Sequence, residues 1–183
     1  MDGFLFVGDS ICDADMYYLS HFLAGDRFAL LAREKTTMLV SSMEKGRAVL
    51  ESIADECLST SQYQIMEKLK ICGKPEEAYL QVLEEFLRDY GIKRVGVPFR
   101  FPAGIYQPLS EDFEVSVMDS PAGRCREIKR QEELDAIACT QRACERAMRR
   151  AVLLISSSTP RGDMLYRDCQ PLTSEEVRGA IEA

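Results

Sequence analysis

Two different apolar periodicities divide the 183-residue sequence and limit the folds that it can adopt. Between residues 4 and 119, short apolar runs alternate with segments in which apolar residues recur at helical spacing. From residue 126 that alternation stops, and one apolar stripe continues at steps of three and four. Alternating strands and helices are typical of layered α/β domains. The sequence therefore predicts an α/β domain over residues 1–122, and over residues 123–183 a connecting helix and the start of a second domain.

Five strands are expected, at residues 4–7, 27–32, 36–41, 92–97 and 113–118. The second and third are separated by Arg33-Glu34-Lys35, a polar tip that suits a hairpin. Because a hairpin is embedded among alternating strands and helices, the sheet should be mixed. The predicted fold is a three-layer α/β/α domain with a mixed sheet.

Helices are expected at residues 43–57, 75–90 and 103–110, with a loop at 59–63. Ala48, Ile53 and Cys57 would share one face of the first helix. Pro75 should begin the second helix, and Gly91 should end it. The stripe after residue 126 predicts a long helix of roughly 28 residues, about 42 Å in length; it comprises Leu134, Ile137, Gln141, Cys144, Met148, Ala151 and Ile155. A loop should follow at residues 156–162.

The last residues begin a further helix. Thr173 can accept a hydrogen bond from the backbone N–H of Glu176, whose side chain can reach back to the N–H of Thr173, which is a capping box. Only about two and a half turns follow, and the apolar pair Val177 and Ile181 is not continued. We therefore expect these residues to be the front part of a longer protein.

Composition and charge exclude several classes of protein. Lys and Arg number 23 against 30 Asp and Glu, a net charge of −7, so nothing favours nucleic acid or an anionic membrane as the main partner. The N-terminus lacks the basic and long apolar regions of a signal peptide, and no segment has the length of a membrane span. Seven cysteines without a Cys-x-x-Cys pair indicate reduced thiols. A cytoplasmic location is expected.

Two short motifs near the N-terminus could suggest catalysis. The Gly-Asp-Ser sequence ending at Ser10 resembles the nucleophile motif of Gly-Asp-Ser esterases, but a serine nucleophile needs a histidine oriented by an aspartate. The sole histidine is His21, and Tyr18 stands where those esterases have the aspartate. Ser10 is therefore expected to be a turn residue or a cap, and Asp13 and Asp15 to make cap and turn bonds. We assign no catalytic residue and no metal ligand in this sequence.

Several segments together resemble a known family. Residues 13–22 are similar to a stretch with the pattern N-x-x-x-x-Y-L-[TS]-G-F, with Asp13 and His21 in place of the Asn and Gly. That stretch is found in the N-terminal domain of the creatinase, prolidase and aminopeptidase P family, the pita-bread metallopeptidases. Further similarities follow in the family's order: the hairpin at residues 27–41 with a helix start at 42–48, an Arg-x-x-Lys connector at 126–129 with residues 132–134, and an entry to the next domain at 172–175.

The resemblance implies a two-domain hydrolase acting at Xaa-Pro bonds. In that family, two divalent metal ions are held by two Asp, one His and two Glu of the C-terminal domain, and none of those positions lies in this sequence. The chain would then be the non-catalytic N-terminal domain, without a cofactor of its own. Its implied partners are its own C-terminal catalytic domain, a second copy in a homodimer, and a peptide substrate in the full protein.

The resemblance also implies which residues border the active-site entrance: Tyr17, Tyr18, His21, Phe22 and Arg27. Packing in the core is an equally weighted interpretation for Tyr18 and Phe22. Two other functions stay open. The parent protein could be a peptidase-like protein-binding module that has lost its metal ligands, or a creatinase-like amidinohydrolase. The sequence that follows residue 183 would separate these alternatives.

Overall fold

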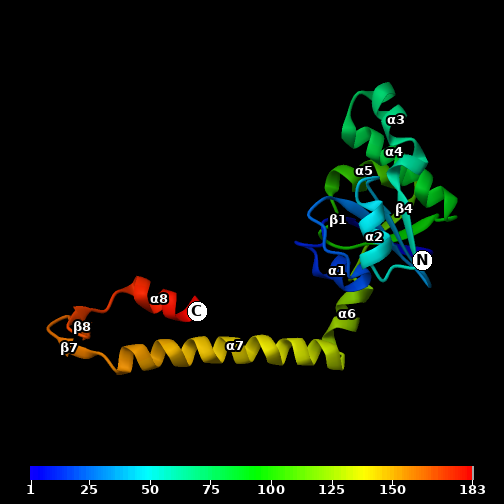
Figure 1. Ribbon diagram of the computed structural model, residues 1–183. Helices are drawn as coiled ribbons and strands as arrows, with labels where there is room; N and C mark the ends of the chain where they lie inside the picture. The colour runs from blue at the N-terminus through cyan, green and yellow to red at the C-terminus, as the bar shows by residue number, and fades with distance from the viewer. Residues whose placement is uncertain (183) are drawn as a thin grey trace. The chain divides into compact units, whose positions relative to one another are not determined.

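The computed structural model describes residues 1–182, and the chain forms two compact units, Met1–Ile128 (unit 1) and Lys129–Ala183 (unit 2). Figure 1 shows the helices and strands of both units. Each unit has its own β-sheet and its own helices. No helix within residues 1–182 is both long and apolar enough to cross a membrane.

Unit 1 is built around a six-stranded sheet with the order β4-β3-β2-β1-β5-β6. The strands are β1 (Gly3–Gly8), β2 (Phe28–Ala32), β3 (Thr36–Val40), β4 (Glu56–Ser59), β5 (Arg94–Val97) and β6 (Glu114–Val117). The β1–β2 and β2–β3 pairs are antiparallel, and the other three pairs are parallel. The predicted mixed sheet and its hairpin are confirmed.

Helices cover both faces of this sheet (Figure 1). They are α1 (Ala14–Ser20), α2 (Lys45–Glu51), α3 (Ile65–Cys72), α4 (Pro75–Asp89), α5 (Ala103–Asp112) and α6 (Pro121–Glu127), with a 3₁₀ turn at Thr60–Tyr63. Side chains alternate along β1: Leu5 and Val7 join the core beneath α4 and α5, while Phe4 and Phe6 join the core that includes α1 residue Met16. A strand buried on both faces explains the continuous apolar run at residues 4–7. The three-layer α/β/α prediction is confirmed.

The predicted helix over residues 43–57 is wrong in its second half. Helix α2 ends at Glu51, and residues 56–59 form β4, where Cys57 lies opposite Met38 of β3. Only Ala48 of α2 is buried, and the chain is already extended at Ser52. The helical spacing of Ala48, Ile53 and Cys57 was coincidental, because pairing with β3 determines the conformation after Ser52. The loop expected at 59–63 is also wrong, since Thr60–Tyr63 is a 3₁₀ turn capped by the preceding serine.

The end of α4 confirms the stop predicted at Gly91. Gly91 has a φ of +66°, its N–H donates to the carbonyl of Arg88 at 2.9 Å, and the N–H of Ile92 donates to the carbonyl of Leu87 at 3.0 Å. These two bonds form a Schellman motif, which satisfies carbonyl groups that the helix leaves without partners. Ile92 and Leu87 are both buried in the core beneath α4. The turn therefore leads the chain directly into β5.

Unit 2 begins with the predicted long helix, α7 (Gln131–Ser156), which has 26 residues. Three short antiparallel strands follow, β7 (Thr159–Arg161), β8 (Met164–Arg167) and β9 (Gln170–Pro171), so the loop expected there is wrong for the residues of β7. Helix α8 (Ser174–Glu182) contacts α7. The capping box is confirmed: Glu176 N–H donates to Thr173 Oγ1 at 3.2 Å, and Thr173 N–H donates to Glu176 Oε2 at 3.3 Å.

Candidate functional site

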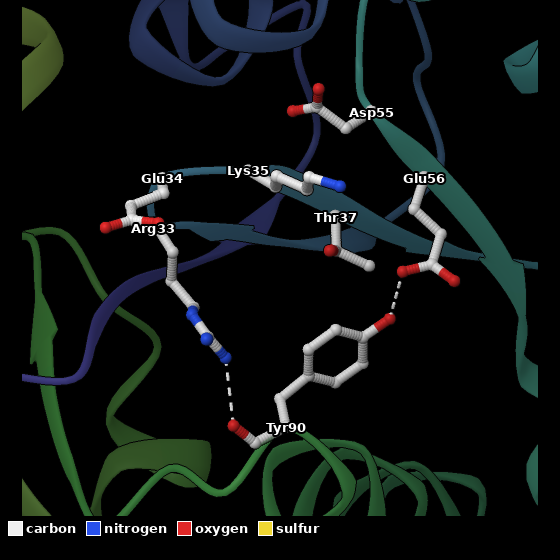
Figure 2. Close-up of a pocket in the computed structure, with 7 residues that line it drawn as sticks. All are labelled: Arg33, Glu34, Lys35, Thr37, Asp55, Glu56 and Tyr90. Carbon is white, nitrogen blue, oxygen red and sulfur yellow. Dashed lines mark hydrogen bonds between the residues drawn. The ribbon is translucent and has the colours of Figure 1, made fainter.

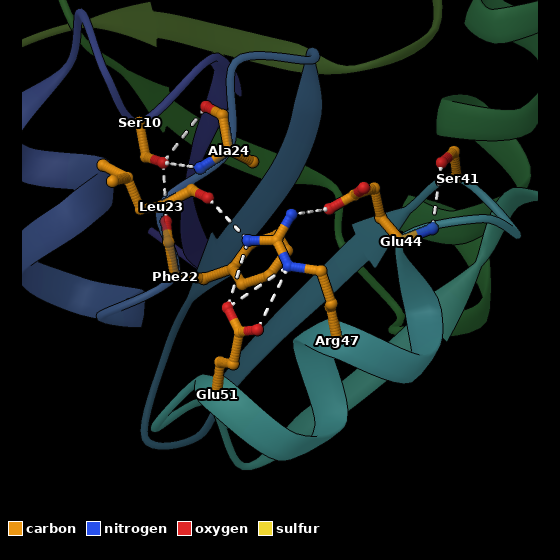
Figure 3. Close-up of polar contacts among 8 residues, drawn as sticks. All are labelled: Ser10, Phe22, Leu23, Ala24, Ser41, Glu44, Arg47 and Glu51. Atoms are coloured by element: carbon orange, nitrogen blue, oxygen red, sulfur yellow. Dashed lines mark hydrogen bonds and ion pairs between the residues drawn. The ribbon is translucent and has the colours of Figure 1, made fainter.

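Ser10 holds the turn after β1 against the segment that leads into β2 (Figure 3). Its hydroxyl donates to the carbonyl of Phe22 at 2.6 Å and accepts from the N–H of Ala24 at 2.8 Å. The side chain is buried, with 3% of its surface exposed. With its hydroxyl engaged by two backbone groups, Ser10 is a structural turn residue, as the sequence predicted.

Asp13 begins α1 as a helix cap. Its carboxylate accepts the N–H groups of Asp15 at 2.9 Å and Met16 at 3.2 Å. Asp15 pairs instead with Arg126 of α6, at 2.5 Å. Each aspartate thus has a structural partner, and the prediction of cap and turn bonds is confirmed for Asp13. Within residues 1–182, no group of three or more His, Cys, Asp or Glu side chains could hold a metal ion.

Tyr17 and His21 lie together on the surface at the end of α1. Their rings stack with centroids 6.0 Å apart and an angle of 17° between the planes. His21 has a φ of +52°, and its N–H donates to the carbonyl of Tyr17 at 2.6 Å. A left-handed residue normally ends a helix as Gly or Asn, which explains the Gly of the motif that residues 13–22 resemble. Both side chains are exposed, so the pair is available to a ligand or a neighbouring domain.

The other three candidate residues lie apart from that pair. Tyr18 is half-buried, and its hydroxyl donates to the carbonyl of Cys125 in α6 at 3.5 Å. Phe22 is fully buried and packs edge-on against Phe28 with the centroids 5.9 Å apart. Arg27 pairs with Glu76 of α4 at 2.6 Å. The structure therefore brings Tyr17 and His21 together and places Phe22 in the core.

Arg47 of α2 holds the loop that contains Phe22 (Figure 3). No motif in the sequence indicates this role. Its guanidinium lies over the Phe22 ring, 4.8 Å from the centroid, and donates to the carbonyl of Leu23 at 2.8 Å. It also pairs with Glu44 at 2.7 Å and with Glu51 at 3.0 Å. The hydrogen bond with Glu51 raises the pKa of Arg47 and lowers the pKa of Glu51. Arg47 thereby links α2 to the segment that follows the Tyr17–His21 pair.

Arg27 makes a second contact, with the ring of Tyr79 on α4. The guanidinium carbon lies 4.3 Å from the ring centroid. The Tyr79 hydroxyl is buried and has no hydrogen-bond partner among the described residues. Burial raises the pKa of Tyr79 far above its ordinary value. A buried hydroxyl without a hydrogen-bond partner lowers the stability of the fold, so its removal should change the free energy of unfolding.

The chain is similar to a known family of protein domains. Residues 1–128 match the sequence model of the creatinase/prolidase N-terminal domain. This match ends where unit 1 ends. No curated protein sequence matches the chain.

Solved structures of Xaa-Pro peptidases are similar to the whole chain. An X-Pro aminopeptidase from Thermotoga maritima superposes with a TM-score of 0.68 at 18% identity, over 100% of this chain and 45% of that one. An Xaa-Pro dipeptidase from Bacillus anthracis gives 0.65 at 14% identity, over 99% and 43%. A prolidase from Pyrococcus horikoshii gives 0.59 at 20% identity, over 100% and 44%. At these identities the likeness establishes the fold, and the chain spans less than half the length of each of these proteins.

Proposed function

Since the chain belongs to the creatinase/prolidase N-terminal domain family, we propose that it is the non-catalytic N-terminal part of a cytosolic, metal-dependent Xaa-Pro peptidase of the aminopeptidase P or prolidase type. The observation that carries the proposal is the family match over all of unit 1. The fold of the whole chain, unit 2 included, is also similar to somewhat less than half of each of two solved Xaa-Pro peptidases.

The metal chemistry would lie outside this chain. The residues within 1–182 do not fit a centre for two divalent ions, because they include no cluster of three or more suitable side chains. The ions would therefore belong to a C-terminal catalytic domain of the same protein. Bound there, they would activate a water molecule and polarise the scissile carbonyl group. This chain would help to bind and orient the peptide substrate and to shield it from water.

The segment after α1 is the part of unit 1 that we propose to border the substrate entrance. Tyr17 and His21 supply an exposed, stacked aromatic surface that could contact a peptide or a neighbouring domain. Phe22 and Arg27 would act indirectly, since one anchors the segment in the core and the other ties it to α4. Tyr18 would fix the distance between α1 and α6.

Helix α7 is the part of unit 2 that we propose to pack against the catalytic domain. Its apolar residues remain exposed within unit 2, among them Leu134, Ile137, Met148 and Leu153. A helix face of this kind needs an apolar cover. We also propose that the protein contacts a second copy of itself in a homodimer.

An activity assay tests the proposal directly. The 183-residue chain, supplied with Mn²⁺ or Zn²⁺, should not hydrolyse an Xaa-Pro dipeptide, whereas the product of the full gene should. Hydrolysis by the 183 residues alone would overturn the assignment of a non-catalytic role. A gene product that lacks the two Asp, one His and two Glu would instead support a protein-binding module. Hydrolysis of an amidino compound rather than a peptide would support a creatinase-like enzyme.

Variants of the full-length protein test the entrance. Tyr17→Ala and His21→Ala should raise the KM for a peptide substrate several-fold and leave kcat nearly unchanged, because they remove binding remote from the reacting bond. Phe99→Ala is a suitable control, because this aromatic side chain is 74% exposed and lies between β5 and α5, outside the segment that follows α1. An unchanged KM in both variants would remove Tyr17 and His21 from the entrance.

A further inference from the structure

A pocket of about 440 Å³ lies at the end of the sheet where the β2–β3 hairpin turns (Figure 2). It is formed by residues from four separate parts of unit 1: the hairpin tip, β3, the start of β4 and the end of α4. Its lining residues are Arg33, Glu34, Lys35, Thr37, Asp55, Glu56 and Tyr90. The volume lies within the range of pockets that bind small molecules.

Opposite charges line different sides of this pocket (Figure 2). Arg33 and Lys35 come from the hairpin, which also contributes Glu34 beside Arg33, and Asp55 and Glu56 come from the segment that begins β4. The ring of Tyr90 forms an apolar wall between them, and the buried Thr37 lies at the base. A ligand in this pocket would meet both signs of charge within a short distance.

Several of these groups are already held in place. Arg33 donates to the carbonyl of Tyr90 at 2.9 Å, and the Tyr90 hydroxyl donates to Glu56. Asp55 accepts the N–H of Thr36 at 2.7 Å. These bonds fix the walls before any ligand arrives, which lowers the entropy lost on binding.

Lys35 differs from its neighbours in the pocket. Its ammonium group points toward the side that carries Asp55 and Glu56, yet no dashed line joins it to any residue drawn (Figure 2). None of the ion pairs found among the described residues involves Lys35. Lys35 can therefore bind a ligand carboxylate without breaking an existing pair, and Glu56 keeps a second oxygen available for a ligand ammonium group.

We propose that this pocket binds a small zwitterion, namely a free α-amino acid. The ligand carboxylate pairs with Lys35, and the ligand ammonium group pairs with Glu56. In an α-amino acid the two charges lie on adjacent carbon atoms, which matches a lysine and a glutamate that face the same small space. The Tyr90 ring covers the apolar side chain of the ligand. The inference does not depend on the proposed peptidase function.

Ligands of a single charge fit less well. An anion would pair with Lys35 but would face Glu34, Asp55 and Glu56, and a cation would face Arg33 and Lys35. A bound metal ion is disfavoured because these carboxylates do not form a metal-binding group with suitable geometry. A zwitterion is the one simple ligand class that each wall attracts.

Titration followed by amide NMR tests the proposal on the 183-residue chain. The probes are L-alanine, which carries both charges, propionate, which lacks the ammonium group of alanine, and ethylammonium, which lacks its carboxylate. We expect L-alanine to shift the amide signals of residues 33–37, 55–56 and 90 saturably, and each single-charge probe to bind at least fivefold more weakly. Equal binding of all three probes, or shifts spread over the whole chain, would overturn the proposal.

Two nearly isosteric variants identify the groups that bind. Lys35→Met and Glu56→Gln should each weaken L-alanine binding by about tenfold, the effect of losing one charged hydrogen bond. Glu56→Gln keeps an acceptor for the Tyr90 hydroxyl, so the wall should remain in place. Lys70→Met, an exposed lysine on α3, is the matched control and should change nothing. Unaltered affinity in the first two variants, with a native amide spectrum, would contradict the proposed contacts.

Discussion

The two units of this chain bury their apolar side chains to very different extents. In unit 1, both faces of the sheet are covered, and Phe6 and Phe86 are almost completely buried. In the described part of unit 2, Ala151 is the only buried apolar residue, while Leu153 on the same helix is 67% exposed. An amphipathic pattern thus predicts a helix in both units but does not reveal whether the chain itself covers the apolar face. Unit 1 has its own core, whereas most apolar side chains of α7 are exposed.

The largest expected effect contrasts one leucine in each unit. Leu83 of α4 is fully buried, so Leu83→Ala should lower the free energy of unfolding of unit 1 by about 2–5 kcal/mol through lost contacts and a cavity. Leu153→Ala removes a largely exposed side chain and should change stability by at most about 0.5 kcal/mol. Urea denaturation followed by circular dichroism measures both. Equal losses would show that α7 is covered in solution, for example by a second copy of the chain.

A pair of glycines with the same backbone conformation sharpens the contrast. Gly91 after α4 and Gly162 between β7 and β8 have φ values of +66° and +62°. Alanine at either position adds strain of about 1–2 kcal/mol. We expect Gly91→Ala to destabilise all of unit 1, because the Schellman turn leads directly into β5. Gly162→Ala should increase amide hydrogen exchange in β7 and β8 alone. Loss of protection throughout unit 1 would show that the two units open together.

Local signals in the sequence predicted much of the fold. Pro75 and Gly91 correctly predicted where α4 begins and ends, and Thr173 and Glu176 predicted the start of α8. Each of these signals acts within one turn of the chain, so the residues that determine the conformation are adjacent in the sequence. Strand β4 has no such signal. Cys57 is in a strand because it pairs with Met38, nineteen positions earlier, and no local pattern reports that contact.

The candidate site also contains residues that local sequence could predict and residues that it could not. Tyr17 and His21 are four residues apart at a helix end, so the sequence could place them on one face. Arg47 could not be predicted, because it contacts Phe22 and Leu23 across a turn and two strands. No sequence motif indicates the charged pocket. It depends on Lys35, Glu56 and Tyr90, which the sheet and α4 bring together from separate segments.

A smaller effect tests how completely the core of unit 1 satisfies its polar groups. Tyr79→Phe removes a buried hydroxyl that has no hydrogen-bond partner in the described structure and keeps the ring beneath Arg27. We expect unit 1 to become more stable by about 1 kcal/mol. Tyr17→Phe, on an exposed ring, is the control and should be neutral. A loss of stability in Tyr79→Phe would show that the hydroxyl is hydrogen-bonded in solution, for example to a buried water molecule.

The smallest expected effect is a difference in the acid sensitivity of the two units. Asp2 accepts the N–H groups of Arg94 at 2.8 Å and Lys93 at 3.0 Å, and these bonds hold its pKa below the ordinary value of 3.8. Since the folded carboxyl has the lower pKa, the folded state binds fewer protons. The stabilisation by Asp2 is therefore present above pH 3.8 and is lost as the pH falls through the pKa of the folded state.

Asp2→Asn separates this contribution from the general effect of acid on unit 1. The wild-type chain should have the higher urea midpoint near neutral pH, and the difference from Asp2→Asn should shrink once the pH falls below 3.8. Glu175 in unit 2 also has a lowered pKa, but its causes are its own backbone N–H and the hydroxyl of Ser174. Because those contacts are local to the first turn of α8, Glu175→Gln should leave the pH dependence of unit 1 unchanged. A difference between wild type and Asp2→Asn that stays constant at every pH would exclude the Asp2 carboxylate as the group that titrates. An equal response to Glu175→Gln would show instead that the two units unfold together.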